Sequence, residues 1–139
     1  MKRRNWVGLV VYLLAAIAPA AAHHSFSAEF DANKPVTLKG TLTRVEWVNP
    51  HGWLYMDAVG PDGVMANWAI EAGAPNALLR RGLRKTDFPA GAEIVVQGFL
   101  AKNGGRVANG TTVKFVDGRE FFMGSSNTGA PTDAAKSSR

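Results

Sequence analysis

Alternation of apolar and polar residues predicts five β-strands in the chain after residue 34. The strands, in chain order, cover residues 35–48, 53–59, 64–71, 92–101 and 111–116, and a short extension follows at 119–123. The first strand is expected to bend at Gly40, because glycine favours a bulge or a tight bend within a strand. After the third strand the alternation stops, and leucines at helical spacing behind Pro75 predict a short helix over 74–83.

Turn sequences separate the predicted strands. They occupy residues 49–52, 60–63, 103–105 and 109–110. In the second of them, Pro61 presets one backbone dihedral and Gly63 accepts the left-handed one, which is typical of a hairpin. We therefore expect the strands at 53–59 and 64–71 to pair antiparallel.

Three strands, a helix and two further strands form the element order of an OB-fold. The predicted fold is mainly β: a small five-stranded OB-like antiparallel barrel over residues 35–123, with one short helix between strands three and four. A half-open antiparallel sheet covered by one helix would give the same order. Residues 23–34 are predicted to form a polar N-terminal arm that lies on the body of the domain, with Phe26 and Phe30 as its large anchors. Residues 124–139, which lack aromatic and branched apolar side chains, are expected to be disordered.

The first 22 residues have the three zones of a signal peptide. Basic residues at 2–4 precede an apolar run at 6–18, and Pro19 and three alanines follow, so we expect cleavage after Ala22 and a periplasmic protein. The alternative is a retained anchor, but this run is shorter than the roughly 20 residues of a spanning helix. Arg3 and Arg4 leave both the general and the twin-arginine export routes open.

Cleavage would also remove three of the sixteen Lys and Arg residues, leaving thirteen against eleven Asp and Glu and a net charge of +2. The remaining basic cluster, 80–85, lies at the end of the predicted helix, where cations favour the helix dipole. We therefore expect no nucleic-acid partner. Cysteine is absent, so stability must come from the core or from a bound ligand.

The three histidines suggest a copper site. After cleavage, His23 would offer its α-amine and its imidazole to one metal ion, His51 would supply a third nitrogen, and His24 is a spare donor. Such nitrogen ligation in a tetragonal plane suits Cu(II) and resembles the histidine brace of some secreted copper proteins. The plainer interpretation is that these histidines are solvated or bonded to the backbone.

Aromatic residues support a second hypothesis, a metal-free binding module. Trp47, Trp53 and Trp68 lie on predicted strands, where they would either bind a small molecule or a periplasmic protein partner or fill the core. No catalytic motif is present. The strand carboxylates of Glu46, Asp57 and Glu71 are expected to face solvent, so no catalytic residue is assigned.

Several segments resemble a family of short exported bacterial proteins of unknown function. The most specific are the His-His-Ser-Phe sequence at 23–26 and the Asn-Pro-His turn at 49–51, and further likeness runs through 68–71, 91–98 and 117–119. The resemblance implies export and a single small β domain, and it implies no activity. It also associates the predicted terminal histidine pair with the Asn-Pro-His turn, as a shared site would require.

Overall fold

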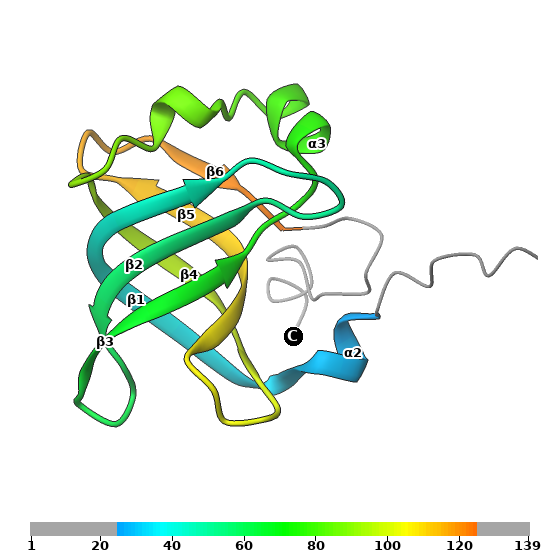
Figure 1. The fold of residues 1–139 in the computed structure, drawn as a ribbon, viewed down its shortest axis with the longest axis vertical. Coiled ribbons are helices and arrows are strands. Elements are labelled where there is room, and N and C mark those ends of the chain that lie inside the picture. The colour runs from blue at the N-terminus through cyan, green and yellow to red at the C-terminus, as the bar shows by residue number, and fades with distance from the viewer. Residues whose placement is uncertain (1–24, 125–139) are drawn as a thin grey trace, which may run out of the picture.

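The computed structural model describes residues 25–124 (Figure 1). The predicted signal peptide and nearly all of the predicted tail therefore lie outside the described residues. The elements, in chain order, are α2 (Phe26–Glu29), β1 (Phe30–Glu46), β2 (Trp53–Val59), β3 (Met65–Glu71), α3 (Pro75–Arg80), a 3-10 helix (Lys85–Asp87), β4 (Glu93–Ala101), β5 (Val107–Phe115) and β6 (Glu120–Phe122). Within residues 25–124, no helix is long and apolar enough to cross a membrane.

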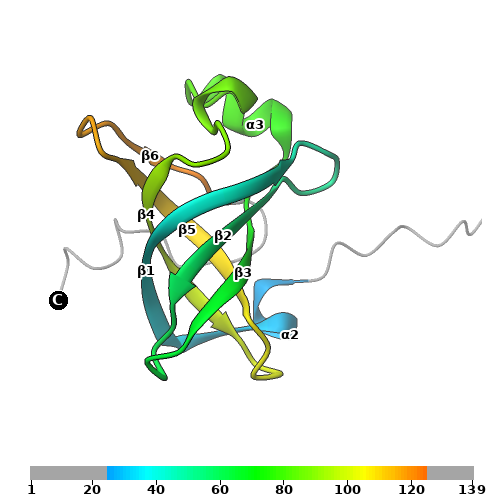
Figure 2. The ribbon, with the colours of Figure 1, turned by 60° about the vertical axis from the view of Figure 1, so that its left-hand side comes forward.

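Hydrogen bonds join five of the strands into a closed ring. The ring runs β1, β2, β3, β5, β4 and back to β1, and β6 extends it beside β5 (Figure 2). Closure depends on a parallel pairing of β3 with β5, whereas the other pairs are antiparallel. The predicted OB-like barrel is confirmed, and the half-open sheet is excluded because the ring closes.

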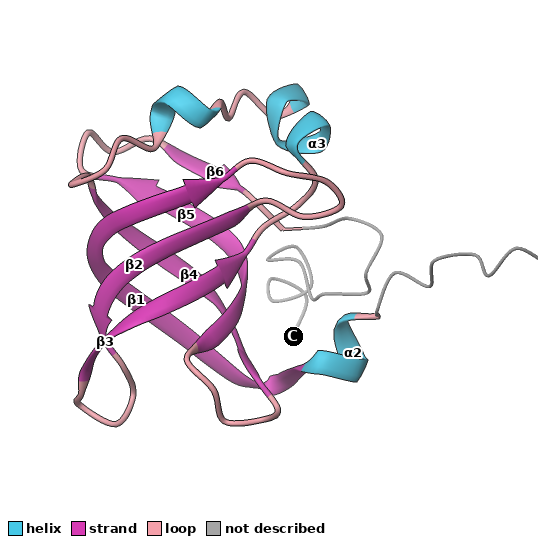
Figure 3. Cartoon of the chain, in the orientation of Figure 1, coloured by secondary structure: helices cyan, strands magenta, loops and turns pink. Residues whose placement is uncertain are grey.

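One hydrophobic core fills the barrel. Alternate residues of β2 point inward, so Leu54, Met56 and Ala58 are buried while the residues between them lie on the outer surface or are partly covered. Leu78 of α3 and Phe88 after the 3-10 helix belong to the same core. Figure 3 shows α3 over one end of the barrel and the loops of the β2–β3 and β4–β5 hairpins at the other.

The N-terminal segment is more structured than the predicted arm. β1 starts at Phe30 instead of residue 35, and α2 precedes it. Phe26 stacks on Phe30 and meets Phe99 edge-on, with ring centroids 5.7 and 5.5 Å apart, and these rings form a second apolar cluster with Ala101. Two aromatic anchors in a polar segment thus attach α2 to the outside of the barrel.

Gly40 allows two strands to approach closely, which refines the predicted bend. It pairs with Ala58 on β2 and with Ile94 on β4, so β1 hydrogen-bonds on both sides there. A Cβ atom at Gly40 would lie 1.9 Å from the carbonyl oxygen of Asp57. The register shift of the β1–β2 pair falls slightly later, between Leu42 and Arg44.

The predicted turn at Asn109–Gly110 is wrong, because both residues lie within β5. Gly98 of β4 pairs with Gly110 next to a register shift, and a Cβ at Gly110 would lie 2.8 Å from Ile70 Cγ2. Glycine serves here to let the strands and core side chains approach, not to reverse the chain. The glycine turns at 60–63 and 103–105 are confirmed, and both Gly63 and Gly104 adopt the left-handed φ of 75°.

Candidate functional site

A row of side chains crosses the outer face of the barrel where β3 meets β5. Glu71 at the end of β3 pairs with Trp53 on one side and with Asn109 on the other, and Asn109 pairs with Phe99. Paired residues project to the same side of a sheet. This side is the outside, because the chain neighbours of the row face the core: Leu54, Ile70 and Ala108.

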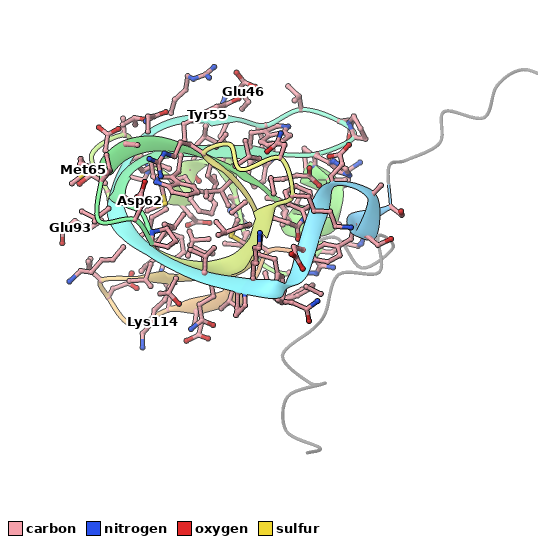
Figure 4. The ribbon with its side chains drawn as sticks, turned by 90° about the horizontal axis from the view of Figure 1, so that it is seen from below. Glu46, Tyr55, Asp62, Met65, Glu93 and Lys114 are labelled. Atoms are coloured by element: carbon pink, nitrogen blue, oxygen red, sulfur yellow. The ribbon has the colours of Figure 1, made fainter. Side chains whose placement is uncertain are left out.

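Glu71 is nevertheless buried, with 5% of its surface exposed, so the expectation that it faces solvent is wrong. Its carboxylate accepts a hydrogen bond from Asn109 Nδ2 at 3.3 Å and lies 3.1 Å from His51 Nδ1. Glu46, by contrast, is only half-buried, and the Tyr55 hydroxyl donates to it at 3.3 Å (Figure 4). Asp57 is also exposed.

Burial raises the pKa of Glu71 to about 7, and the negative charge of Glu29 on α2 acts in the same direction. The hydrogen bond from Asn109 opposes these two effects. Desolvation disfavours the charged carboxylate because the interior solvates it less well than water does. Near neutral pH, Glu71 therefore exchanges a proton readily while facing an imidazole.

The backbone fixes His51 in its position. The loop that carries it contains a cis peptide bond between Asn49 and Pro50. The amide of Gly52 donates to the carbonyl of Gly73 at 3.1 Å, and the amide of Ala72 donates to the carbonyl of Gly52 at 2.8 Å. These two bonds tie the loop to the chain just after Glu71. The imidazole is 17% exposed and presents Nδ1 to the carboxylate.

Asn109 leaves one polar atom without a partner. The residue is 1% exposed, and within residues 25–124 its Oδ1 accepts no hydrogen bond. A buried acceptor without a donor costs roughly 1–3 kcal/mol. The cluster of Glu71, His51 and Asn109 is thus polar, buried and incompletely satisfied, which is more typical of a functional site than of a structural core.

A pocket of about 360 Å³ opens on the same face. Its walls come from α2, the start of β1 and the β4–β5 hairpin, and Trp53 lies at its edge. The lining residues are Ala28, Glu29, Phe30, Trp53, Ala101, Lys102, Asn103 and Val107. Two views place α2 and the loop of His51 on one side of the barrel (Figure 1, Figure 2).

The three candidate tryptophans do not share a surface. Trp68 is 2% exposed and belongs to the core, and Trp47 packs against Phe88 with the ring centroids 6.1 Å apart. Trp53 alone of the three lines a pocket on the outer face of the barrel. A stacking platform built from all three rings is therefore not formed.

Of the predicted metal ligands, the structure describes only His51, since His23 and His24 lie outside the described residues. Among residues 25–124, no group of three or more His, Cys, Asp and Glu side chains is placed to hold a metal ion. A site of the predicted kind would consequently need the residues that precede Ser25.

Sequence reasoning missed Asn109 because its neighbour Gly110 resembles a turn residue. It also assigned no role to Glu29, which lies in the segment interpreted as a polar arm. Phe26 and Phe30 had indicated that this segment packs on the domain, but they gave no sign of which strand residue Glu29 approaches.

The fold and the site together define a small OB-like barrel with a buried carboxylate–imidazole pair on its outer face, beside a docked N-terminal helix. The chain belongs to DUF6152, a family of unknown function, whose family model matches residues 11–111. No curated protein and no solved structure matches the chain. Membership in this family assigns no activity, so the function must be argued from the site.

Proposed function

We propose that this protein is exported, is cleaved after Ala22, and binds one Cu(II) ion through its new N-terminus and His51. The α-amine and imidazole of His23 and the imidazole of His51 would supply three nitrogen ligands, with His24 as a spare donor. The observation that carries the proposal is the contact of His51 Nδ1 with the buried carboxylate of Glu71 at 3.1 Å. Metal-binding histidines commonly use one ring nitrogen for such a carboxylate and the other for the metal.

The position of α2 supports the proposal. Glu29 on this helix lies close enough to Glu71 for its charge to raise the pKa of that carboxyl. Phe26 anchors the helix through Phe30 and Phe99. Ser25 directly precedes α2, so the chain reaches the described part of the protein on the face that carries Glu71 and His51. A terminus at His23 would begin two residues before Ser25.

The ligand chemistry favours copper over other divalent ions. An amine and two imidazoles form a nitrogen-only set, and Cu(II) has the highest affinity among the divalent first-row metals for such donors in a tetragonal plane. Cysteine, which soft Cu(I) prefers, is absent from the chain. An α-amine with a pKa near 8 also loses its proton to a metal readily.

The first prediction concerns the terminus. Mature protein that starts at His23 is expected to bind one equivalent of Cu(II) at least about 30-fold more tightly than protein with one additional serine before His23, because the extension moves the amine out of the chelate ring. Competition with a chromophoric chelator measures the two affinities, and EPR reports the number of coordinated nitrogens. Equal affinities would contradict the brace.

Two substitutions test the loop side of the same site. His51→Ala is expected to weaken Cu(II) binding by about 10-fold to 100-fold, and His24→Gln is the matched control that should leave most of the affinity intact. If His51→Ala binds copper as the unaltered mature protein does, His51 is not a ligand and the proposed site is wrong.

The pocket beside Trp53 favours one alternative, a metal-free module that binds a small molecule or a periplasmic protein partner. Trp53 and the aliphatic part of Lys102 offer apolar surface there, and Glu29 offers charge. A thermal-shift screen of small aromatic compounds against chelator-treated protein, with Trp53→Ala as the control, tests this alternative. A compound that stabilises the protein only when Trp53 is present would support it.

A further inference from the structure

A second pocket lies at the end of the barrel remote from α3, between the loops of the β2–β3 and β4–β5 hairpins. It measures about 230 Å³. Figure 4 looks toward this end, where Asp62 is labelled. The side chains that bear on its chemistry are Lys34, Asp62, Trp68 and Arg106, and the glycines of the β4–β5 loop complete the wall.

Trp68 brings an unused hydrogen-bond donor to this pocket. Its indole Nε1 is buried and, within residues 25–124, has no acceptor. Most buried side-chain polar groups have a partner, so an unpaired indole N–H beside a pocket requires an explanation. Trp68 is 2% exposed and Nε1 itself is covered, so a ligand oxygen reaches this donor only if neighbouring side chains move.

Three side chains come close to the position that a Cβ of Gly60 would occupy. Their distances from it show which edge of the Trp68 ring faces the loops. A Cβ at Gly60 would lie 2.7 Å from Trp68 Cζ2, 2.9 Å from Asp62 Oδ1 and 3.1 Å from a terminal guanidinium nitrogen of Arg106. Cζ2 and Nε1 are bonded to the same ring carbon, so they share one edge of the indole. The ring edge at Cζ2, next to the carbon that bears Nε1, therefore faces the loops of the pocket.

The charges around this edge favour an anionic group. Arg106 donates to Asp62 Oδ2 at 2.6 Å, and its guanidinium carbon lies 5.4 Å from the centre of the Trp68 ring. A guanidinium has five N–H donors, so this bond leaves others for a ligand. Lys34 adds a positive charge and pairs loosely with Asp31 at 3.9 Å.

Among the described residues that line the pocket, Asp62 alone carries a carboxylate, and this carboxylate is already engaged. Asp62 Oδ2 accepts from Arg106, and Asp62 Oδ1 accepts from the amide of Val64 at 3.1 Å. Asp62 is therefore poorly suited to hold a cation. The other polar side-chain groups are an indole, a guanidinium and an ammonium, which all donate hydrogen bonds. The complementary ligand is therefore one that accepts hydrogen bonds.

We propose that this pocket binds a small organic carboxylate, whose oxygens accept hydrogen bonds from Trp68 Nε1 and Arg106 while Lys34 supplies further positive charge. Asp62 holds Arg106 in place when the ligand is absent and competes with the ligand for it. This pocket does not involve the histidines, so the inference does not depend on copper binding.

Acetate is the probe for the test, with ¹H–¹⁵N NMR of the indole signals of Trp47, Trp53 and Trp68 in folded mature protein at constant ionic strength. Acetate is expected to move the Trp68 indole proton downfield in a saturable manner and to leave the other two signals in place. Arg106→Gln should weaken acetate binding at least about tenfold. Asp62→Asn should strengthen it, because the competing carboxylate is gone.

The two variants separate binding from structure, since a loop contact that only stabilises the fold would be damaged equally by either change. The Trp47 and Trp53 signals report whether each variant is folded. A Trp68 shift that does not saturate, an equal shift with chloride, or acetate affinity that falls alike in Arg106→Gln and Asp62→Asn would overturn the proposal.

Discussion

Replacing Gly40 with alanine is expected to lower the free energy of unfolding by at least about 3 kcal/mol, near the upper end of what overpacking costs. The added Cβ would lie 1.9 Å from the backbone oxygen of Asp57 and 2.9 Å from the Cβ of Ala58. Neither atom belongs to the far end of a side chain, so neither can turn away. The clash can be relieved only if β1 and β2 separate.

Separation at this position is costly because β1 is hydrogen-bonded to β2 and β4 at the same residue. Movement away from one strand displaces β1 relative to the other, and the ring of strands cannot open at Gly40 without losing both pairings. The substitution therefore affects the whole barrel instead of a single contact.

Thermal unfolding of the purified variant measures the effect, and a loss of this size corresponds to a decrease in melting temperature of more than about 12 °C for a domain of this length. Gly52→Ala is the matched control, since its Cβ would lie 3.4 Å from the carbonyl oxygen of Gly73, an ordinary contact. Equal stability of the two variants would contradict the close approach at Gly40.

The second large effect is the pH dependence of stability that Glu71 introduces. A carboxyl whose pKa rises from 4.5 in the unfolded chain to about 7 in the folded protein favours folding while it is protonated. This contribution is complete below pH 4.5 and is lost as the pH rises toward 7. The full change amounts to about 3 kcal/mol, at 1.36 kcal/mol per pH unit.

Glu71→Gln keeps the shape of the protonated side chain and cannot ionise, so it isolates this contribution. Compared with this variant, the unaltered protein is expected to lose about 3 kcal/mol of stability between pH 4.5 and 7. Urea unfolding of both proteins across this range, in the presence of a chelator, measures the difference. Among residues 25–124, the titratable groups that face Glu71 are Glu29 and His51, and both remain in the variant.

A stability difference that stays constant from pH 4.5 to 7 would show that Glu71 ionises at an ordinary pKa, and the burial argument would then fail. His51→Gln offers a second check. If the pH dependence of stability arises from ionisation of the Glu71 carboxyl, most of it should persist after His51 is replaced.

Local sequence signals predicted the elements whose structure depends on near neighbours. The hairpin at 60–63 and the helix that begins at Pro75 follow from backbone preferences within a few residues. Alternation in β2 likewise predicts which of its residues share a face, because side chains in a strand alternate regardless of the remaining chain. The order of these elements favoured an OB-like barrel but also fitted a half-open sheet, and the pairing of β3 with β5 decided between them.

The candidate site depends on contacts between distant parts of the chain, and sequence reasoning missed its details for that reason. Asn109 joins Glu71 only because β5 pairs in parallel with β3, and Gly110 lies within that strand instead of a turn. Glu71 is buried beside His51 and Asn109, which come from distant parts of the chain. A strand glutamate gives no local sign of such cover.

The sequence by itself determined the order of elements along the chain from the first predicted strand, the turns at 60–63 and 103–105, the short helix that begins at Pro75, and the interest of His51. These follow from local preferences and from the scarcity of histidine. Only the tertiary structure decided that Glu71 is buried against His51, that Trp68 fills the core, and that Trp53 faces outward. The physical reason is that burial is a property of packing: whether a carboxylate is solvated or desolvated depends on which distant segments cover it.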